Sequence, residues 1–230
     1  MTSPDSSRTS FTDKTHVRTR PAFLSATLLA AALAVAPLIA RAGAQAEESL
    51  AQSVVTVLSR AISDRPVPAD WEQLADAQAF IETMSKRLEA RVPNEAERRE
   101  LLRSVHYESV RAGLDPQLVL AVIHHESGFK KYAVSPADAR GYMQVMPFWT
   151  RVIGTPEHNL FHLRTNLRYG CVILRHYLDR EGGDLYRALG RYNGSLGRSE
   201  YPMAVMAAMQ RYSPTTPPVI GVSVRLPVAR

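Results

Sequence analysis

The chain has 230 residues, of which 45% are hydrophobic and 22% charged, a balance typical of one folded domain with appendages. This composition excludes a polytopic membrane protein and a wholly disordered chain. The formal net charge is +6, but without residues 1–44 the chain has 23 basic and 20 acidic residues, a net of +3. We therefore expect no nucleic-acid partner, although an anionic polymer would suit this balance. Cys171 is the only cysteine, so no disulfide can form within the chain.

The first 44 residues have the pattern of a targeting segment. Residues 22–40 carry no charge, follow two arginines and precede the small residues Ala42-Gly43-Ala44. This predicts a signal peptide over residues 1–44 that is cleaved before Gln45, and hence a protein of the periplasm or cell envelope. The alternative is an uncleaved membrane anchor, because 19 uncharged residues almost suffice to cross a bilayer. Alanine-rich composition and Pro37 favour cleavage.

Two amphipathic helices are predicted before the main domain. Apolar residues recur at helical spacing over 50–61 and again over 71–88, with a proline-containing break between them. We assign residues 45–92 to an N-terminal helical extension that packs on the domain. A partner-binding arm is the alternative for this segment.

The main domain is predicted over residues 93–213. Asn94 followed by Glu97 indicates a capping box that opens a helix ending at Gly113. Asp115-Pro116 opens the next helix, which extends to about Ser127. Residues 129–146 lack periodicity and are expected to form a loop with a short element. Further helices are predicted at 148–153, 166–179, 184–192 and 201–212. No run alternates at period two, so the fold class is mainly α, and residues 214–230 are expected to form an irregular tail.

Glu126 is the first candidate for chemistry. At 100° per residue it shares the apolar face of its helix with Val119 and Val122, and it lies near the helix C-terminus. Both placements disfavour the ionised carboxylate, the first by desolvation and the second through the helix dipole. Such a residue taken alone is more often a paired or terminal acid than a catalytic one.

Four short sequence segments, the first of which contains Glu126, bear on the role of this residue. They are Glu126-Ser127-Gly128-Phe129, Ala133-Val134-Ser135-Pro136, Gly141-Tyr142-Met143-Gln144-Val145-Met146-Pro147 and Arg191-Tyr192-Asn193-Gly194. In this order and spacing they resemble the catalytic domain of the soluble lytic transglycosylases over about residues 94–213. The resemblance implies a lysozyme-like α-helical domain, here preceded by the two amphipathic helices.

The resemblance also implies an activity. The substrate would be peptidoglycan, cleaved without water between N-acetylmuramic acid (MurNAc) and N-acetylglucosamine (GlcNAc) to leave a 1,6-anhydroMurNAc end. Glu126 would act as general acid and then as base, with no cofactor and no metal. The count of acids agrees, because a conventional glycosidase needs two carboxylates and Asp138 is the only other acid between Glu126 and Pro147.

The resemblance carries six substrate-binding residues onto this chain: Ser127, Ser135, Gln144, Met146, Tyr192 and Asn193. Ser127 would support the acid, and the tyrosine would lie over the reacting sugar. The chain departs from the family where Asp138 replaces a common glycine, although aspartate tolerates a left-handed backbone. Tyr142 replaces a usual leucine, and either contacts a sugar ring or packs inside.

Three other functions were considered. His158 and His162 have a spacing that can chelate zinc, but no His-Glu-x-x-His motif occurs and we expect no metal. A lysozyme-type muramidase would use the same acid and let water attack. A wall-binding accessory subunit of a secretion or conjugation machine would dock through residues 45–92.

Overall fold

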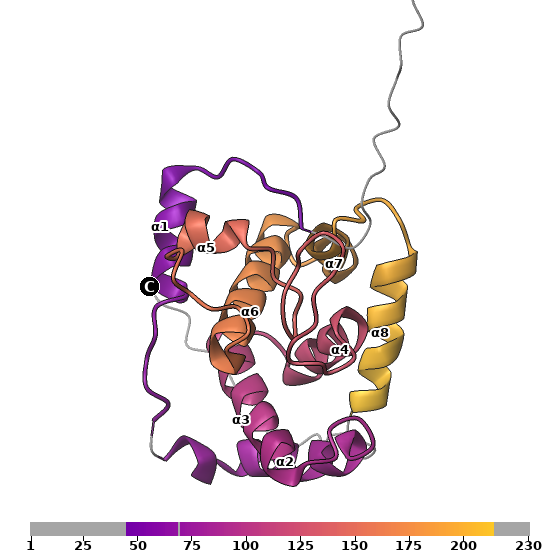
Figure 1. The fold of residues 1–230 in the computed structure, drawn as a ribbon. Helices are drawn as coiled ribbons and strands as arrows, with labels where there is room; N and C mark the ends of the chain where they lie inside the picture. Colours follow the sequence, from indigo (N-terminus) through magenta and orange to yellow (C-terminus); the bar gives the residue numbers. More distant parts are fainter. Residues whose placement is uncertain (1–44, 69, 214–230) are drawn as a thin grey trace, which may run out of the picture. The chain divides into compact units, whose positions relative to one another are not determined.

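The structure, a computed structural model, describes residues 45–68 and 70–213, all within one compact unit. In this part of the chain every regular element is helical, apart from two isolated β-bridges, which confirms the mainly α class (Figure 1). The predicted leader and tail lie outside the described residues. None of the described helices is long and apolar enough to cross a membrane.

The N-terminal extension contains α1 (Gln52–Ala61) and α2 (Ala75–Leu88). The prediction of one helix from residue 71 to 88 was wrong at its start. A separate 3₁₀ turn covers Trp71–Gln73, and the extended backbone of Leu74 interrupts the helical path before α2. The indole of Trp71 packs edge-on against His106, with ring centroids 4.7 Å apart, so that the turn is fixed by a tertiary contact.

Two predicted helix starts are confirmed by their caps. Helix α3 spans Glu95–Arg111, and the Glu97 main-chain N–H donates to Asn94 Oδ1. Helix α4 spans Pro116–Glu126, with Asp115 as the N-cap. Between them Gly113 has φ +68°, the left-handed conformation that glycine adopts at a helix end.

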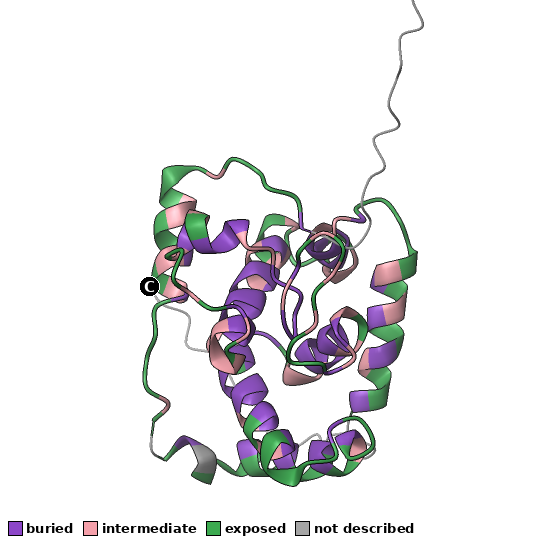
Figure 2. Ribbon diagram, in the orientation of Figure 1, coloured by how far each residue is buried: buried purple, intermediate pink, exposed green. Residues whose placement is uncertain are grey.

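The other helices lie close to their predicted ranges: α5 Phe148–Ile153, α6 Leu163–Arg180, α7 Leu185–Asn193 and α8 Glu200–Tyr212. Helix α4 packs extensively against α8, while α7 contacts both α6 and α8. Residues 118–123 of α4 are all buried, so this helix lies in the core and its C-terminal end carries Glu126 (Figure 2). The apolar run of residues 118–123 therefore belongs to a buried helix, as predicted from the Asp115-Pro116 start.

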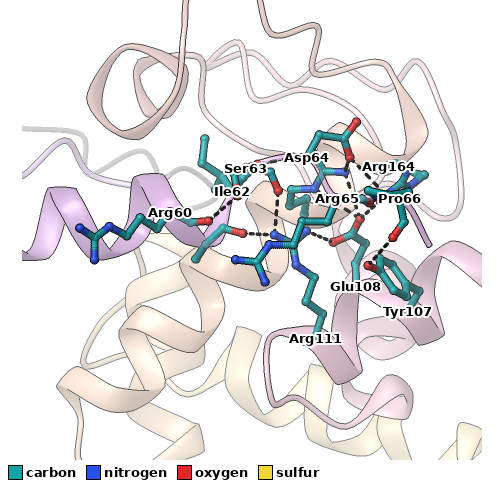
Figure 3. Close-up of polar contacts among 12 residues, drawn as sticks. Arg60, Ile62, Ser63, Asp64, Arg65, Pro66, Tyr107, Glu108, Arg111 and Arg164 are labelled. Atoms are coloured by element: carbon teal, nitrogen blue, oxygen red, sulfur yellow. Dashed lines mark hydrogen bonds and ion pairs between the residues drawn. The ribbon is translucent and has the colours of Figure 1, made fainter. Parts of the chain in front are cut away.

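A cluster of salt bridges joins the segment after α1 to the rest of the domain (Figure 3). Its members, which we call the Glu108 cluster, are Asp64, Glu108, Arg111, Arg164 and Arg168. The carboxylate of Glu108 on α3 is 1% exposed and faces three of these arginines, with N···O distances of 3.3–3.6 Å. Arg111 also donates to the main-chain carbonyls of Ala61 and Ser63. The extension is thus packed on α3 and α6 at this point.

Candidate active site

Glu126 is the last residue of α4 and lies where α7 and α8 meet that helix. The hydroxyl of Tyr201, on α8, donates to Glu126 Oε1 at 2.5 Å. The side chain of Asn193, at the end of α7, also hydrogen-bonds to the carboxyl group. Three helices thereby place one acid between two neutral hydrogen-bond donors.

Burial raises the pKa of Glu126 from 4.5 to about 7, and the hydrogen bonds from Tyr201 and Asn193 offset part of this effect. The residue as a whole is partly exposed, while its carboxyl group is desolvated by burial. Because its pKa lies near neutrality, the group can both donate and accept a proton at physiological pH, as acid–base catalysis requires.

Tyr201 was not among the residues predicted for the site. The sequence indicated only that a helix begins near it, and the contact with Glu126 depends on how α8 packs along α4. Burial and the neighbouring Glu126 raise the pKa of Tyr201 well above its usual value. The phenol therefore remains a neutral donor throughout the physiological range.

Residues 133–146 form a loop that contacts α6 through Asn166 and α7 through Tyr192. Val134 and Val145 both form antiparallel bridges with Arg140, which folds the segment back on itself. Asp138 has φ +68°, confirming that aspartate takes the left-handed conformation expected where the family has glycine. Its carboxylate pairs with Arg140 at 2.9 Å, on the exposed side of the loop.

Asn166 of α6 holds this loop in place, a role that sequence reasoning missed. Its Oδ1 accepts the Met143 N–H at 2.8 Å, and its Nδ2 donates to the carbonyls of Arg140 and Leu160. Gly170, one turn further along α6, allows the close approach of Met143, since a Cβ there would lie 2.4 Å from the sulfur. The loop is therefore held by the buried amide of Asn166 and by the space that a glycine leaves at position 170.

Three of the predicted binding side chains make contacts inside the protein. Ser127 Oγ donates to the Ile123 carbonyl of α4. Ser135 Oγ accepts the N–H groups of Ala137 and Ala139. The side chain of Gln144 is buried and donates to two carbonyls of its own loop. Their contacts with a sugar remain predictions.

The predicted pair Tyr192-Asn193 links the acid to the loop. Tyr192 is fully buried and its hydroxyl donates to the Met143 carbonyl at 2.8 Å, whereas Asn193 reaches Glu126. Met146 is half-buried against the core. The structure thus brings Asn193 to the acid and uses Tyr192 to support the loop, and the predicted stacking of Tyr192 on a sugar is not tested.

His158, one of the two histidines whose spacing can chelate zinc, has a hydrogen-bonding partner inside the protein. His158 Nδ1 lies 2.7 Å from the hydroxyl of Tyr169, and within the described ranges no group of three or more potential ligands could hold a metal ion.

Tyr142 is buried, at one wall of a groove of about 470 Å³ shared with Phe129 and Tyr132. A cavity of about 530 Å³ lies between α1, α3 and α6, and Glu126 is not among its lining residues.

The helical fold is consistent with a lysozyme-like domain. Residues 104–205 match the family model described as the transglycosylase SLT domain, which confirms over that range the resemblance indicated by the four sequence segments. The chain is 47% identical over 128 residues to the membrane-bound lytic murein transglycosylase C of Edwardsiella ictaluri, covering 46% of this chain. It is 32% identical over 124 residues to the protein of that name from Salmonella typhimurium, and 33% identical over 93 residues to the transglycosylase of Enterobacteria phage PRD1. The chain spans about a third of the length of these relatives, 34% in each case.

Proposed function

We propose that this protein is a peptidoglycan lytic transglycosylase that cleaves the MurNAc-β-1,4-GlcNAc bond and leaves a 1,6-anhydroMurNAc end. The observation that carries the proposal is the glutamate at the end of α4, Glu126, which has a pKa of about 7 and two neutral hydrogen-bond donors, Tyr201 and Asn193, at its carboxyl group. The match to the transglycosylase SLT domain and the names of the murein transglycosylase relatives support the same activity.

The reaction has two proton transfers at one carboxyl group. In the first, protonated Glu126 donates to the glycosidic oxygen, the bond from that oxygen to the muramyl anomeric carbon breaks, and GlcNAc leaves as an alcohol. The N-acetyl oxygen of the muramyl residue stabilises the positive charge on its anomeric carbon. In the second, ionised Glu126 takes the proton of the muramyl 6-hydroxyl as that oxygen bonds to the anomeric carbon. The acid is regenerated and no water is consumed.

Hydrolysis by a muramidase is the competing outcome. An inverting hydrolase needs a second carboxylate to activate water, and a retaining one needs a nucleophile. Asp138 is a poor candidate for either role because it has a left-handed backbone conformation in the loop and pairs with Arg140. The 6-hydroxyl is already tethered to the reacting sugar, and well-oriented tethered groups reach effective molarities of roughly 10⁵–10⁸ M.

Digestion of purified sacculi in ¹⁸O-labelled water tests the proposal. We expect new muramyl ends that carry no label and have the mass of the anhydro form. Labelled reducing ends as the main product would instead identify a muramidase that uses Glu126 as its acid. Absence of any cleavage by the folded protein would exclude both activities.

We also propose that the protein acts in the periplasm or cell envelope after removal of residues 1–44. The apolar run and the small residues before Gln45 support this. Terminal sequencing of protein from the envelope fraction should find Gln45 first, whereas a retained Met1 on membrane-bound protein would indicate an anchor. The relatives' names mention no secretion or conjugation machine, and we do not propose one as a partner.

A further inference from the structure

Residues 45–51, which we call the N-terminal strap, precede α1, and Gln45 at their start contacts the loop of residues 133–146 although it is distant in sequence. The strap extends from α1 toward α7 (Figure 1). Gln45 is 4% exposed, and its carboxamide makes two hydrogen bonds. Nε2 donates to the Gln144 carbonyl at 3.2 Å, and Oε1 accepts the Met146 N–H at 3.0 Å.

These two partners are main-chain groups of residues that the sequence predicted to bind sugar. The side chain of Gln144 donates inside its own loop, so the groups of this stretch that meet Gln45 are the Gln144 carbonyl and the N–H of Met146. Two consecutive residues of α7 link this loop to the acid, because Tyr192 donates to the Met143 carbonyl and Asn193 hydrogen-bonds to Glu126. Gln45 thus occupies a main-chain donor and acceptor in the loop that α7 links to the candidate catalytic group.

A peptidoglycan strand carries the same kinds of group as the Gln45 side chain. Each sugar has an acetamido group and hydroxyls, which can donate to a carbonyl and accept from an N–H. The Gln144 carbonyl and the Met146 N–H must lose their hydrogen bonds to Gln45 before a glycan can bind them. Binding of the Gln45 side chain and binding of a glycan to these two groups are therefore mutually exclusive.

Few polar contacts hold the strap, while Leu50 at its α1 end packs against the core. The main chain of residues 46–50 makes no hydrogen bond to any other described residue. Besides Gln45, its polar anchor is Glu48, which is 38% exposed and pairs with Arg180 and, at 3.6 Å, with Arg191. Exposed ion pairs of this kind contribute little to stability.

We propose that the N-terminal strap competes with the glycan for one binding site, because the Gln45 side chain occupies the Gln144 carbonyl and the Met146 N–H. This rests on the proposed function, because the competing ligand is the peptidoglycan strand. If Gln45 occupies this site in roughly nine molecules of ten, its removal tightens the apparent affinity for glycan about tenfold. Raised salt weakens the pairs of Glu48 and acts in the same direction.

The test uses the secreted chain with Glu126→Gln, so that the glycan is not consumed, and an N-acetylglucosamine hexamer as the probe. Calorimetry compares this protein with one that also carries Gln45→Ala. The matched control is Gln52→Ala, at an exposed glutamine of α1. Masses are measured first, because an N-terminal glutamine can cyclise with loss of ammonia and so lose Nε2.

We expect binding about five to ten times tighter with Gln45→Ala and unchanged binding with Gln52→Ala. In proteins with intact Glu126, Gln45→Ala should lower KM for sacculi and leave kcat unchanged. Unchanged or weaker binding would show that Gln45 only supports the loop, and would overturn the competition while sacculi are still cleaved to anhydro ends. If no variant binds the hexamer and none cleaves sacculi, the proposed function fails together with this inference.

Discussion

Two glutamates of this protein, Glu108 and Glu126, have opposite surroundings. Glu108, in the Glu108 cluster, is 1% exposed and faces three guanidinium groups within 3.6 Å. Glu126 faces a phenol and a carboxamide, and no arginine or lysine is among the causes of its pKa shift. The first acid is surrounded by compensating charge, whereas the second is desolvated among neutral donors.

This contrast separates an acid that stabilises the fold through ion pairs from an acid whose pKa is raised by burial. Desolvation without a charged partner favours the neutral form of a carboxyl group. A buried charge that loses its partners is strongly destabilising. Substitutions at Glu108 should therefore affect stability, and substitutions at Glu126 should affect the reaction.

The largest expected effect follows from Glu126→Gln. The amide is nearly isosteric but cannot donate and recover a proton, and general acid–base assistance alone is worth on the order of 10²–10⁴ in rate. We expect release of muropeptides from sacculi to fall by at least this factor, with an unchanged circular dichroism spectrum. Substantial residual cleavage would show that another group is the acid.

Glu108→Gln should lower the stability of the fold and leave the reaction nearly unchanged. The change leaves Arg168, whose side chain is 7% exposed, without its buried carboxylate partner. We expect a loss of about 3 kcal/mol in the free energy of unfolding, measured by urea denaturation at pH 7. The folded fraction should cleave sacculi with kcat close to that of the unaltered protein. A large fall in kcat without destabilisation would contradict the division of roles.

Much of the helical frame could be predicted from local signals. The caps at Asn94 and Asp115 act through main-chain N–H groups two or three residues away, and these contacts depend on sequence alone. The missed features depend on tertiary packing. Tyr201 reaches Glu126 across 75 residues, and Asn166 holds a loop 23 residues earlier in the chain. The extended backbone of Leu74 likewise follows a turn fixed by packing of Trp71 on another helix.

The contrast predicts a pH-dependent stability difference between the Glu126→Gln variant and the unaltered protein. The folded protein binds a proton at Glu126 up to about pH 7, whereas the unfolded chain releases it near 4.5. The unaltered protein therefore loses stability as pH rises between these values. The full shift corresponds to about 3 kcal/mol, and partial exposure reduces our expectation to about 2 kcal/mol. The measurement is thermal denaturation of both proteins at pH 4 and at pH 8. We expect the stability of the variant relative to the unaltered protein to be greater at pH 8 than at pH 4. An equal stability difference at the two pH values would contradict the raised pKa.

Tyr201→Phe tests the smallest expected effect. The hydrogen bond from Tyr201 lowers the pKa of Glu126, so its loss should raise that pKa further. Hydrogen bonds to charged groups are worth about 1.5 kcal/mol or more, which corresponds to about one pH unit.

Because the first step needs protonated Glu126, the alkaline limb of the pH–rate profile should move upward by about that amount. Tyr212→Phe is the matched control, since Tyr212 lies on the same helix and bonds His124 instead of the acid. The control should leave the limb in place. A lower rate at every pH without movement of the limb would mean that Tyr201 only packs α8 against α4, and that the surroundings of Glu126 are set by burial and Asn193 alone.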